Sequence, residues 1–290
     1  MAKLIDGREV AETLKSKLLT LTETLAKETG VKPGLAILRV GEDPASQLYV
    51  HTKGISAKEI GFHFEEHAFP AWVAPAALES TIQELNQSPH IHGIILQLPL
   101  PTPLDKAYFL SLVDPQKDVD GLHPLNVGKL FQGSSGGFVP PTPLGCLLLL
   151  QTLYPSLEGR MVGIVGGSAL VGKPMAMLML QQGATVWVAH SKTVNLPALC
   201  ETAEILIVAI GSPGFIQGEW IQNGATVLDV GINRLASGKI VGDVDFATAE
   251  KRAGAITPVP GGVGPMTVVS LLRNTLESAY RSVGWEFPVL

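Results

Sequence analysis

Apolar residues recur along the chain with two spacings, which predict helices and short buried strands. Between residues 5 and 29 they fall three or four positions apart, which predicts an amphipathic helix ending at Gly30. The apolar positions of this helix are Val10, Leu14, Leu18, Leu21 and Leu25. Short continuous apolar runs predict buried strands at 35–40 and 93–98. Helices that alternate with buried strands indicate an α/β fold with parallel strands.

A second series of elements follows a segment at 132–143 that is rich in glycine, serine and proline. Such a segment is typical of a domain junction. Beyond it we predict helices near 145–153 and from about Pro174, and strands at 161–165, 185–189, 205–210 and 226–230. This series is typical of a doubly wound nucleotide-binding sheet. We therefore predict two α/β domains, 1–138 and a Rossmann-like 139–265, with the segment 266–290 packing back on the first domain.

Composition and charge narrow the class of protein. Of the 290 residues, 46% are hydrophobic and 16% charged, which suits a folded protein with a sizeable core. The net charge of −5 is spread without long runs, which argues against a nucleic-acid binder. Cys146 and Cys200 stand apart from each other and from any ligand cluster, so we predict neither a disulfide scaffold nor a metal site. With no apolar stretch near 18 residues, we expect a cytoplasmic protein that does not enter membranes.

A glycine-rich loop lies between a predicted strand and a predicted helix. Gly166, Gly167, Ser168 and Gly172 occupy it, and glycines at such a turn let the backbone approach a pyrophosphate at the helix N-terminus. The spacing departs from the common GxGxxG fingerprint, and a strand-to-helix turn can carry glycines for structural reasons alone. Dinucleotide binding is the favoured interpretation, and a structural turn is the alternative.

The end of the next strand bears on the choice of dinucleotide. A site for NAD usually offers an acid about 20 residues after the loop, to bind the ribose 2′-hydroxyl. This chain instead offers Ser191 and Lys192, and a hydroxyl beside a cation suits a 2′-phosphate. We therefore favour NADP over NAD, although both residues could also be a solvated strand end.

Other polar side chains stand where a ligand could bind. A helix predicted from Asp43 to about Gly61 carries Tyr49 and Lys53 on one face, where partial burial would lower the pKa of the lysine toward the range of a general base. Gln97 falls near the carboxyl end of a predicted strand, and Asp120 lies in an acidic turn. From spacing alone a snorkelling surface lysine and an ordinary turn acid are the more common interpretations.

Six segments along the chain resemble the bifunctional methylenetetrahydrofolate dehydrogenase/methenyltetrahydrofolate cyclohydrolase family, the bacterial FolD type. They read SQLYVHTKG (46–54), GIILQLPLP (93–101), KDVDGLHPLNVGKL (117–130), GGSALVGKPM (166–175), DVGINR (229–234) and TPVPGGVGPMT (257–267). The resemblance implies oxidation of 5,10-methylenetetrahydrofolate with NADP⁺ to the methenyl compound, followed by hydrolysis to 10-formyltetrahydrofolate. It also implies a homodimer.

The resemblance assigns roles to the polar side chains of the first predicted domain. Lys53 would be the central catalytic group, Gln97 would tune it, Tyr49 would stack and position, and Asp120 would anchor the pterin. Methenyltetrahydrofolate is a cation, so attack by water calls for a base that is itself largely uncharged.

The resemblance extends to the second predicted domain. Ile232 would contact the cofactor, and Pro260, Gly261 and Gly262 would lie against substrate and nicotinamide.

Two departures from the family pattern are visible. Pro141 and Leu144 stand where many members have cysteine and a basic residue, and Gly167 stands where some members have an arginine facing the 2′-phosphate. The second departure weakens the preference for NADP without reversing it. A non-catalytic folate or dinucleotide binder and a two-domain amino-acid or shikimate-type dehydrogenase are the alternatives to this enzyme.

Overall fold

The computed structural model describes residues 1–289, which divide into two compact units. The six-stranded unit comprises Met1–Glu12 and Thr142–Thr267. The three-stranded unit comprises Thr13–Pro141 together with the chain from Val268 onward. The helices α1 (Gly7–Thr29) and α10 (Val263–Ser282) each contribute residues to both units.

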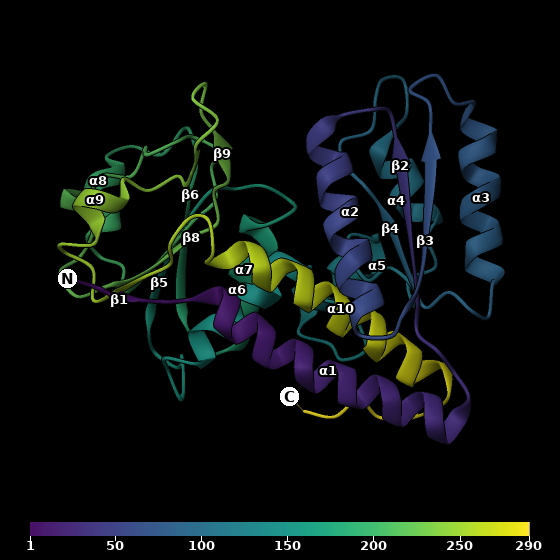
Figure 1. The fold of residues 1–290 in the computed structure, drawn as a ribbon. Coiled ribbons are helices and arrows are strands. Elements are labelled where there is room, and N and C mark those ends of the chain that lie inside the picture. The colour runs from purple at the N-terminus through teal and green to yellow at the C-terminus, as the bar shows by residue number, and fades with distance from the viewer. Residues whose placement is uncertain (290) are drawn as a thin grey trace. The chain divides into compact units, whose positions relative to one another are not determined.

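A parallel sheet forms the centre of the three-stranded unit, in the order β3-β2-β4. Its strands are β2 (Gly34–Val40), β3 (His63–Phe69) and β4 (Gly93–Leu96). Within this unit α3 covers one face of the sheet, and α2 lies on the other (Figure 1). The helices of the unit, besides α1 and α10, are α2 (Pro44–Glu59), α3 (Pro75–Gln87), α4 (Lys106–Leu112) and α5 (Pro124–Gln132).

Side chains alternate between the two faces of this sheet. On the α3 side, one apolar cluster joins strand residues such as Leu38 and Ile94 to Leu78 and Ile82 of the helix. On the other side, Gly93 packs closely against Thr275 of α10, where a Cβ atom would come within 2.9 Å of the threonine hydroxyl. Because β2 and β4 are buried on both faces, they read in the sequence as continuous apolar runs.

The six-stranded unit is built on a parallel sheet in the order β1-β11-β8-β7-β5-β6. Its strands are β1 (Lys3–Leu4), β5 (Met161–Val165), β6 (Thr185–Ala189), β7 (Ile205–Val208), β8 (Thr226–Asp229) and β11 (Ala255–Ile256). A small antiparallel pair is formed by β9 (Asn233–Arg234) and β10 (Ile240–Val241). The remaining helices are α6 (Pro141–Gln151), α7 (Gly172–Gln181), α8 (Leu196–Cys200), the 3₁₀ helix η1 (Gly218–Trp220) and α9 (Phe246–Ala249).

The two-domain α/β fold with a Rossmann-like sheet is confirmed, and the differences from the sequence-based elements are local. Residues 1–12 belong to the six-stranded unit, because β1 pairs with β11 at its edge, whereas the sequence-based division placed them with 1–138. Two residues are too short a strand to give a periodic signal. In the three-stranded unit the prediction missed α3, α4, α5 and β3, an edge strand that alternates polar and partly buried positions. In the other unit it missed the short elements β9, β10, β11, α8 and α9.

The boundaries of several predicted elements also shift. The strand predicted at 93–98 ends at Leu96, the one predicted at 205–210 ends at Val208, and the helix expected from Pro174 begins at Gly172. Within residues 1–289, none of the helices has the length and apolar character needed to cross a membrane.

Candidate active site

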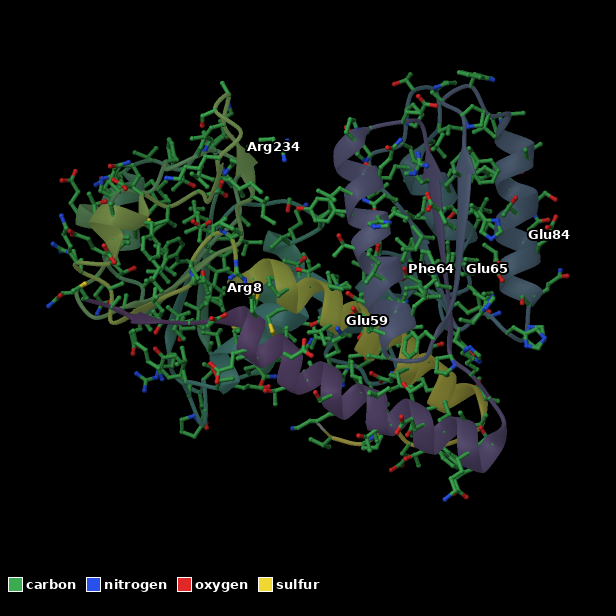
Figure 2. The ribbon with its side chains drawn as sticks, in the orientation of Figure 1. Arg8, Glu59, Phe64, Glu65, Glu84 and Arg234 are labelled. Atoms are coloured by element: carbon green, nitrogen blue, oxygen red, sulfur yellow. The ribbon has the colours of Figure 1, made fainter. Side chains whose placement is uncertain are left out.

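The helix α2 holds Tyr49 and Lys53 one turn apart on the same face. It begins where Asp43 caps its first turn, with the Ser46 N–H donating to Asp43 Oδ2 at 2.8 Å and Pro44 in the first turn. Next to Lys53, Gly54 lets the helix approach β3, since a Cβ atom there would lie 2.6 Å from the ring of Phe64. Figure 2 labels Phe64 on β3 beside α2.

Gln97 meets Lys53 at the carboxyl end of β4. The Gln97 backbone N–H donates to the Leu38 carbonyl at 2.9 Å and continues the ladder between β4 and β2. Its side-chain Nε2 donates to the Leu98 carbonyl at 3.0 Å, which turns Oε1 toward the lysine. Lys53 Nζ donates to Gln97 Oε1 at 3.1 Å. The structure thus joins two half-buried side chains that lie 44 positions apart in the sequence.

Asp120 lies close enough to Lys53 for the two charges to interact. Burial raises the pKa of the Asp120 carboxyl, the charge of Lys53 lowers it, and nearby Asp118 raises it again. Tyr49 keeps a partly exposed ring, and burial raises the pKa of its hydroxyl. The structure therefore gathers Lys53, Gln97 and Asp120 at the end of the three-stranded sheet, with Tyr49 one helical turn before the lysine.

A buried carboxylate holds the turn that carries Asp120. Asp118 is 3% exposed and forms a parallel bridge with Ile94 beside β4. Its carboxylate accepts hydrogen bonds from the backbone N–H groups of Leu122 and His123, at 3.2 and 2.7 Å, and from Asn126 Nδ2 at 2.8 Å. Asp118 therefore fixes the conformation of the loop around Asp120.

In the six-stranded unit, the glycine loop joins β5 to α7 in a tight turn. A Cβ atom on Gly166 would lie 2.1 Å from the Ala209 carbonyl oxygen, and φ at this glycine is +130°. A Cβ atom on Gly172 would lie 1.7 Å from the Gly166 carbonyl oxygen. Gly167 and Ser168 are exposed, and the Val171 N–H donates to Ser168 Oγ at 3.1 Å. These glycines allow the helix to start directly against the strand, as dinucleotide-binding loops require.

Ser191 and Lys192 lie at the end of β6, the neighbour of β5 in the sheet. Both are exposed, in a turn closed by the Thr193 N–H donating to the His190 carbonyl at 2.8 Å. A Cβ atom on Gly167 would lie 3.7 Å from the Cβ of His190. The serine and lysine are therefore adjacent to the glycine loop, where a ligand bound to that loop could reach them.

The other candidate residues of this unit lie in two loops. Ile232 is 48% exposed in the loop after β8. Pro260 is exposed, whereas Gly261 and Gly262 are buried. A Cβ atom on Gly261 would lie 3.0 Å from the guanidinium of Arg8, and one on Gly262 would lie 2.5 Å from Thr257. Close packing within the unit thus already requires glycine at both positions. Arg8, which packs against Gly261, is labelled in Figure 2.

No cluster of three or more His, Cys, Asp or Glu side chains in the described part of the chain could hold a metal ion. His63 and His67 of β3 each hydrogen-bond to the carboxylate of Glu65, at 2.6 and 3.0 Å.

Two family models match nearly the whole chain. Residues 5–120 match the catalytic domain of tetrahydrofolate dehydrogenase/cyclohydrolase, and residues 140–283 match its NAD(P)-binding domain. The bifunctional protein FolD of Brucella ovis is 50% identical over 298 residues, covering 100% of both chains. The chain belongs to the tetrahydrofolate dehydrogenase/cyclohydrolase family.

Solved structures of family members have the same fold over almost their full length. The FolD enzyme of Campylobacter jejuni superposes with a TM-score of 0.95 at 43% identity, covering 97% of this chain and 99% of that one. The FolD of Trypanosoma brucei, solved with NADP and an inhibitor, gives a TM-score of 0.94 at 40% identity, covering 98% and 99%. The match to both family domains favours this enzyme over the shikimate-type dehydrogenase considered from the sequence.

Sequence reasoning missed three buried acids near the candidate site residues. Asp118 supports the loop of Asp120, and in the six-stranded unit Asp229 and Asp243 are buried at the end of the sheet. For Asp229 the sequence does indicate burial, because this residue ends the apolar strand β8. Asp243 has no such local signal, because its partners lie more than 30 positions earlier and in β9.

Proposed function

We propose that this chain oxidises 5,10-methylenetetrahydrofolate to the methenyl compound with NADP⁺ and then hydrolyses that product to 10-formyltetrahydrofolate. Both domains of the family are present, a catalytic and an NAD(P)-binding one. The observation that supports the reaction most directly is the hydrogen bond from Lys53 to Gln97, with Asp120 close enough to interact with the lysine charge. A candidate base, its neutral partner and a carboxylate thus lie together at the carboxyl ends of strands, where ligands of α/β sheets bind.

Asp120 is proposed to anchor the pterin ring. A carboxylate can accept two hydrogen bonds from an amino group and an adjacent ring N–H, which fixes the orientation of the ring. Asp118 would hold the loop in the conformation that presents Asp120. Tyr49, exposed on the same face of α2 as Lys53, would stack on the folate and position it.

Lys53 is proposed to be the general base of the hydrolysis. As water attacks the methenyl carbon, its oxygen forms the new C–O bond and the electron pair of the C=N bond moves onto nitrogen. The proton of the water passes to the free-amine form of Lys53, which becomes an ammonium group. The C–N5 bond of the adduct then breaks as its hydroxyl becomes the formyl carbonyl, and the hydroxyl proton passes to N5. The ammonium releases its proton to solvent, which leaves one proton per turnover. Gln97 would accept a hydrogen bond from the Lys53 side chain and so orient it toward the attacking water.

The glycine loop fits a dinucleotide, because side chains at Gly166 and Gly172 would collide with backbone oxygens while the exposed Gly167 and Ser168 leave the outer side of the loop open. These four residues would hold the pyrophosphate at the start of α7. When bound, NADP⁺ supplies the hydride acceptor for the oxidation.

Further contacts are proposed around this loop. Ser191 and Lys192 would bind the 2′-phosphate and select NADP over NAD. Ile232 would contact the cofactor, and Pro260, Gly261 and Gly262 would lie near substrate and nicotinamide.

In this proposal the predicted domain 1–138, apart from residues 1–12 and together with 266–290, binds folate, and 139–265 binds NADP. The resemblance further predicts a cytoplasmic homodimer. Light scattering on the purified protein tests the dimer, and a mass near twice 30.7 kDa is expected.

The proposed function is tested by incubating the protein with methylenetetrahydrofolate and either NADP⁺ or NAD⁺. Absorbance at the bands of the reduced nicotinamide and of the methenyl chromophore follows the two reactions separately. We expect reduction of NADP⁺ in preference to NAD⁺, with little accumulation of the methenyl compound. Binding of both ligands without turnover would instead identify a non-catalytic binder.

A further inference from the structure

Two buried carboxylates lie at the carboxyl end of the six-stranded sheet. Asp229 ends β8 and is 4% exposed, while Asp243 follows β10 and is 0% exposed. Burying a charged carboxylate costs free energy unless hydrogen bonds replace the lost water. Each of these acids receives several hydrogen bonds, and the donors come from loops at this end of the sheet.

Asp243 receives three consecutive backbone amides on one carboxylate. Its Oδ2 accepts from the N–H groups of Ile210 and Gly211 at 2.7 and 2.9 Å, and its Oδ1 accepts from the Ser212 N–H at 2.8 Å. Oδ1 also accepts from Asn233 Nδ2 at 2.8 Å. The carboxylate therefore fixes the loop 210–212 and connects it to the segment that carries Ile232.

Asp229 in turn holds the backbone around Asp243. Its carboxylate accepts from the N–H groups of Gly231, Asp243 and Val244 at 3.0, 2.9 and 2.9 Å. Two glycines, Gly231 and Gly242, allow the two carboxylates to lie this close to the backbone. A Cβ atom on Gly231 would lie 2.2 Å from Asp243 Cγ, and one on Gly242 would lie 1.9 Å from Asp229 Oδ2.

The position of loop 210–212 in the sheet relates this network to the dinucleotide site. The loop follows β7, which pairs with β5, and the glycine loop follows β5. From β5 the chain runs first to β6 on one side and then to β7 on the other, so the strand order reverses between β5 and β7. Ligands of doubly wound sheets bind in the crevice at this point.

The order of the strands also assigns the two ends of the dinucleotide. Ser191 and Lys192 follow β6, on one side of β5, whereas loop 210–212 and Ile232 follow β7 and β8, on the other. A dinucleotide whose 2′-phosphate lies at β6 and whose pyrophosphate lies at the glycine loop extends its nicotinamide half toward β7 and β8.

We propose that Asp243 is a positioning residue for the nicotinamide half of NADP⁺, holding loop 210–212 and Asn233 in their binding conformation while Asp229 holds Asp243. The inference rests on the proposed function. Burial raises the pKa of Asp229 to about 6, and the charge of Asp243 contributes to the rise, as expected for two carboxylates held close together.

The test measures the affinities of the Asp243→Asn variant for NADP⁺, for adenosine 2′,5′-bisphosphate and for folate. Each is measured by calorimetry with the other two ligands absent. The added NH₂ group faces N–H donors, so the loop loses bonds to a charged acceptor, and Kd for NADP⁺ should rise about 10- to 100-fold. Kd for adenosine 2′,5′-bisphosphate, which lacks the nicotinamide half, should stay within about twofold, as for an uncoupled site. Kd for folate should likewise be unchanged. Asp245→Asn, two positions away and bonded to Thr248, is the matched control and should leave all three affinities as in the parent.

The outcomes separate this inference from the function it rests on. An unchanged Kd for NADP⁺ in Asp243→Asn overturns the inference, and so does an equal loss for NADP⁺ and the bisphosphate, which would indicate general disorder of the unit. A parent protein that does not bind NADP⁺ overturns the proposed function first and the inference with it. If Asp243→Asn does not fold, Asn233→Ala removes one donor and keeps the carboxylate, and the same split between NADP⁺ and the bisphosphate decides.

Discussion

The two units of the molecule build their candidate sites from different materials. In the six-stranded unit the backbone itself forms the loop after β5. Its key residues are glycines, because a Cβ atom at these positions would collide with carbonyl oxygens. In the three-stranded unit the site consists of side chains, with Lys53 bonded to Gln97 and Asp120 nearby. A backbone site leaves a compact signature in the sequence, since only glycine fits. A side-chain site is assembled from distant segments and leaves almost none.

The largest effect is expected at Lys53. Lys53→Met keeps the length of the side chain and removes the base, so hydrolysis of methenyltetrahydrofolate should fall about 10²-fold or more. Hydride transfer needs no base at the reacting carbon and should keep a larger share of its rate, so the methenyl compound accumulates. The measurement is the ratio of NADPH formed to methenyl chromophore retained.

Lys58→Met, on the same helix and over the ring of Phe64, is the matched control and should behave like the parent. Hydrolysis at the parent rate in Lys53→Met would remove the lysine from the mechanism.

A smaller effect is expected at the predicted 2′-phosphate site. Replacing Ser191 by Asp and Lys192 by Ala removes a cation and adds a carboxylate that repels phosphate. kcat/KM for NADP⁺ should fall by about tenfold or more, while that for NAD⁺ changes far less. Parallel losses for both cofactors would show that these exposed residues are only a strand end.

The sequence predicted the six-stranded unit in more detail than the other one. β5 and β6 have the bounds that their apolar runs predict. β5 is a buried parallel strand and reads as a continuous apolar segment, whereas β6 is a partly exposed edge strand that nevertheless keeps an apolar sequence. β3 was missed because an edge strand carries polar side chains such as Glu65 and Glu66. Leu78, Ile82 and Leu85 of α3 have the three- and four-residue spacing of a helix, so this helix does have a signal in the sequence.

The two candidate sites also differ in how far the sequence predicts them. Strand order and a glycine loop suffice to locate a dinucleotide site, whereas the meeting of Lys53 and Gln97 depends on tertiary structure that no local pattern encodes. Family resemblance, rather than spacing, singled out the side-chain site. Supporting acids such as Asp118 are harder still to predict, because a buried carboxylate and an exposed turn acid look alike in sequence.

The smallest effect concerns stability and has opposite signs in the two units. His92 in the three-stranded unit has its pKa lowered to about 4, mainly by burial and further by Lys117 and His90. Between pH 6.5 and 4 the unfolded chain binds more protons at this residue, so its contribution to the unfolding free energy falls as the pH drops. Asp229, with its pKa raised to about 6, contributes most below pH 4 and loses that contribution as the pH rises toward 6.

His92→Asn sharpens this contrast. The asparagine oxygen can still accept from the Gly34 N–H, as His92 Nδ1 does at 3.1 Å, but it does not titrate. The unfolding free energy is measured by urea unfolding at a series of pH values between 4 and 6.5. In His92→Asn its slope against pH should be smaller than in the parent by up to about 1.4 kcal/mol per pH unit. An unchanged slope in His92→Asn would assign the acid sensitivity elsewhere.

The contrast between a backbone site and a side-chain site is tested most directly by measuring the affinities for NADP⁺ and for folate in two variants. Gly172→Ala places a methyl group where the Gly166 carbonyl oxygen lies, and Asp120→Asn keeps its size but loses a charge and an acceptor. We expect Gly172→Ala to lose NADP⁺ affinity and keep folate affinity, and Asp120→Asn to do the reverse. Gly128→Ala, at a helical position with open space around it, should change neither. Loss of both ligands in both variants, or normal NADP⁺ binding by Gly172→Ala, would contradict the account.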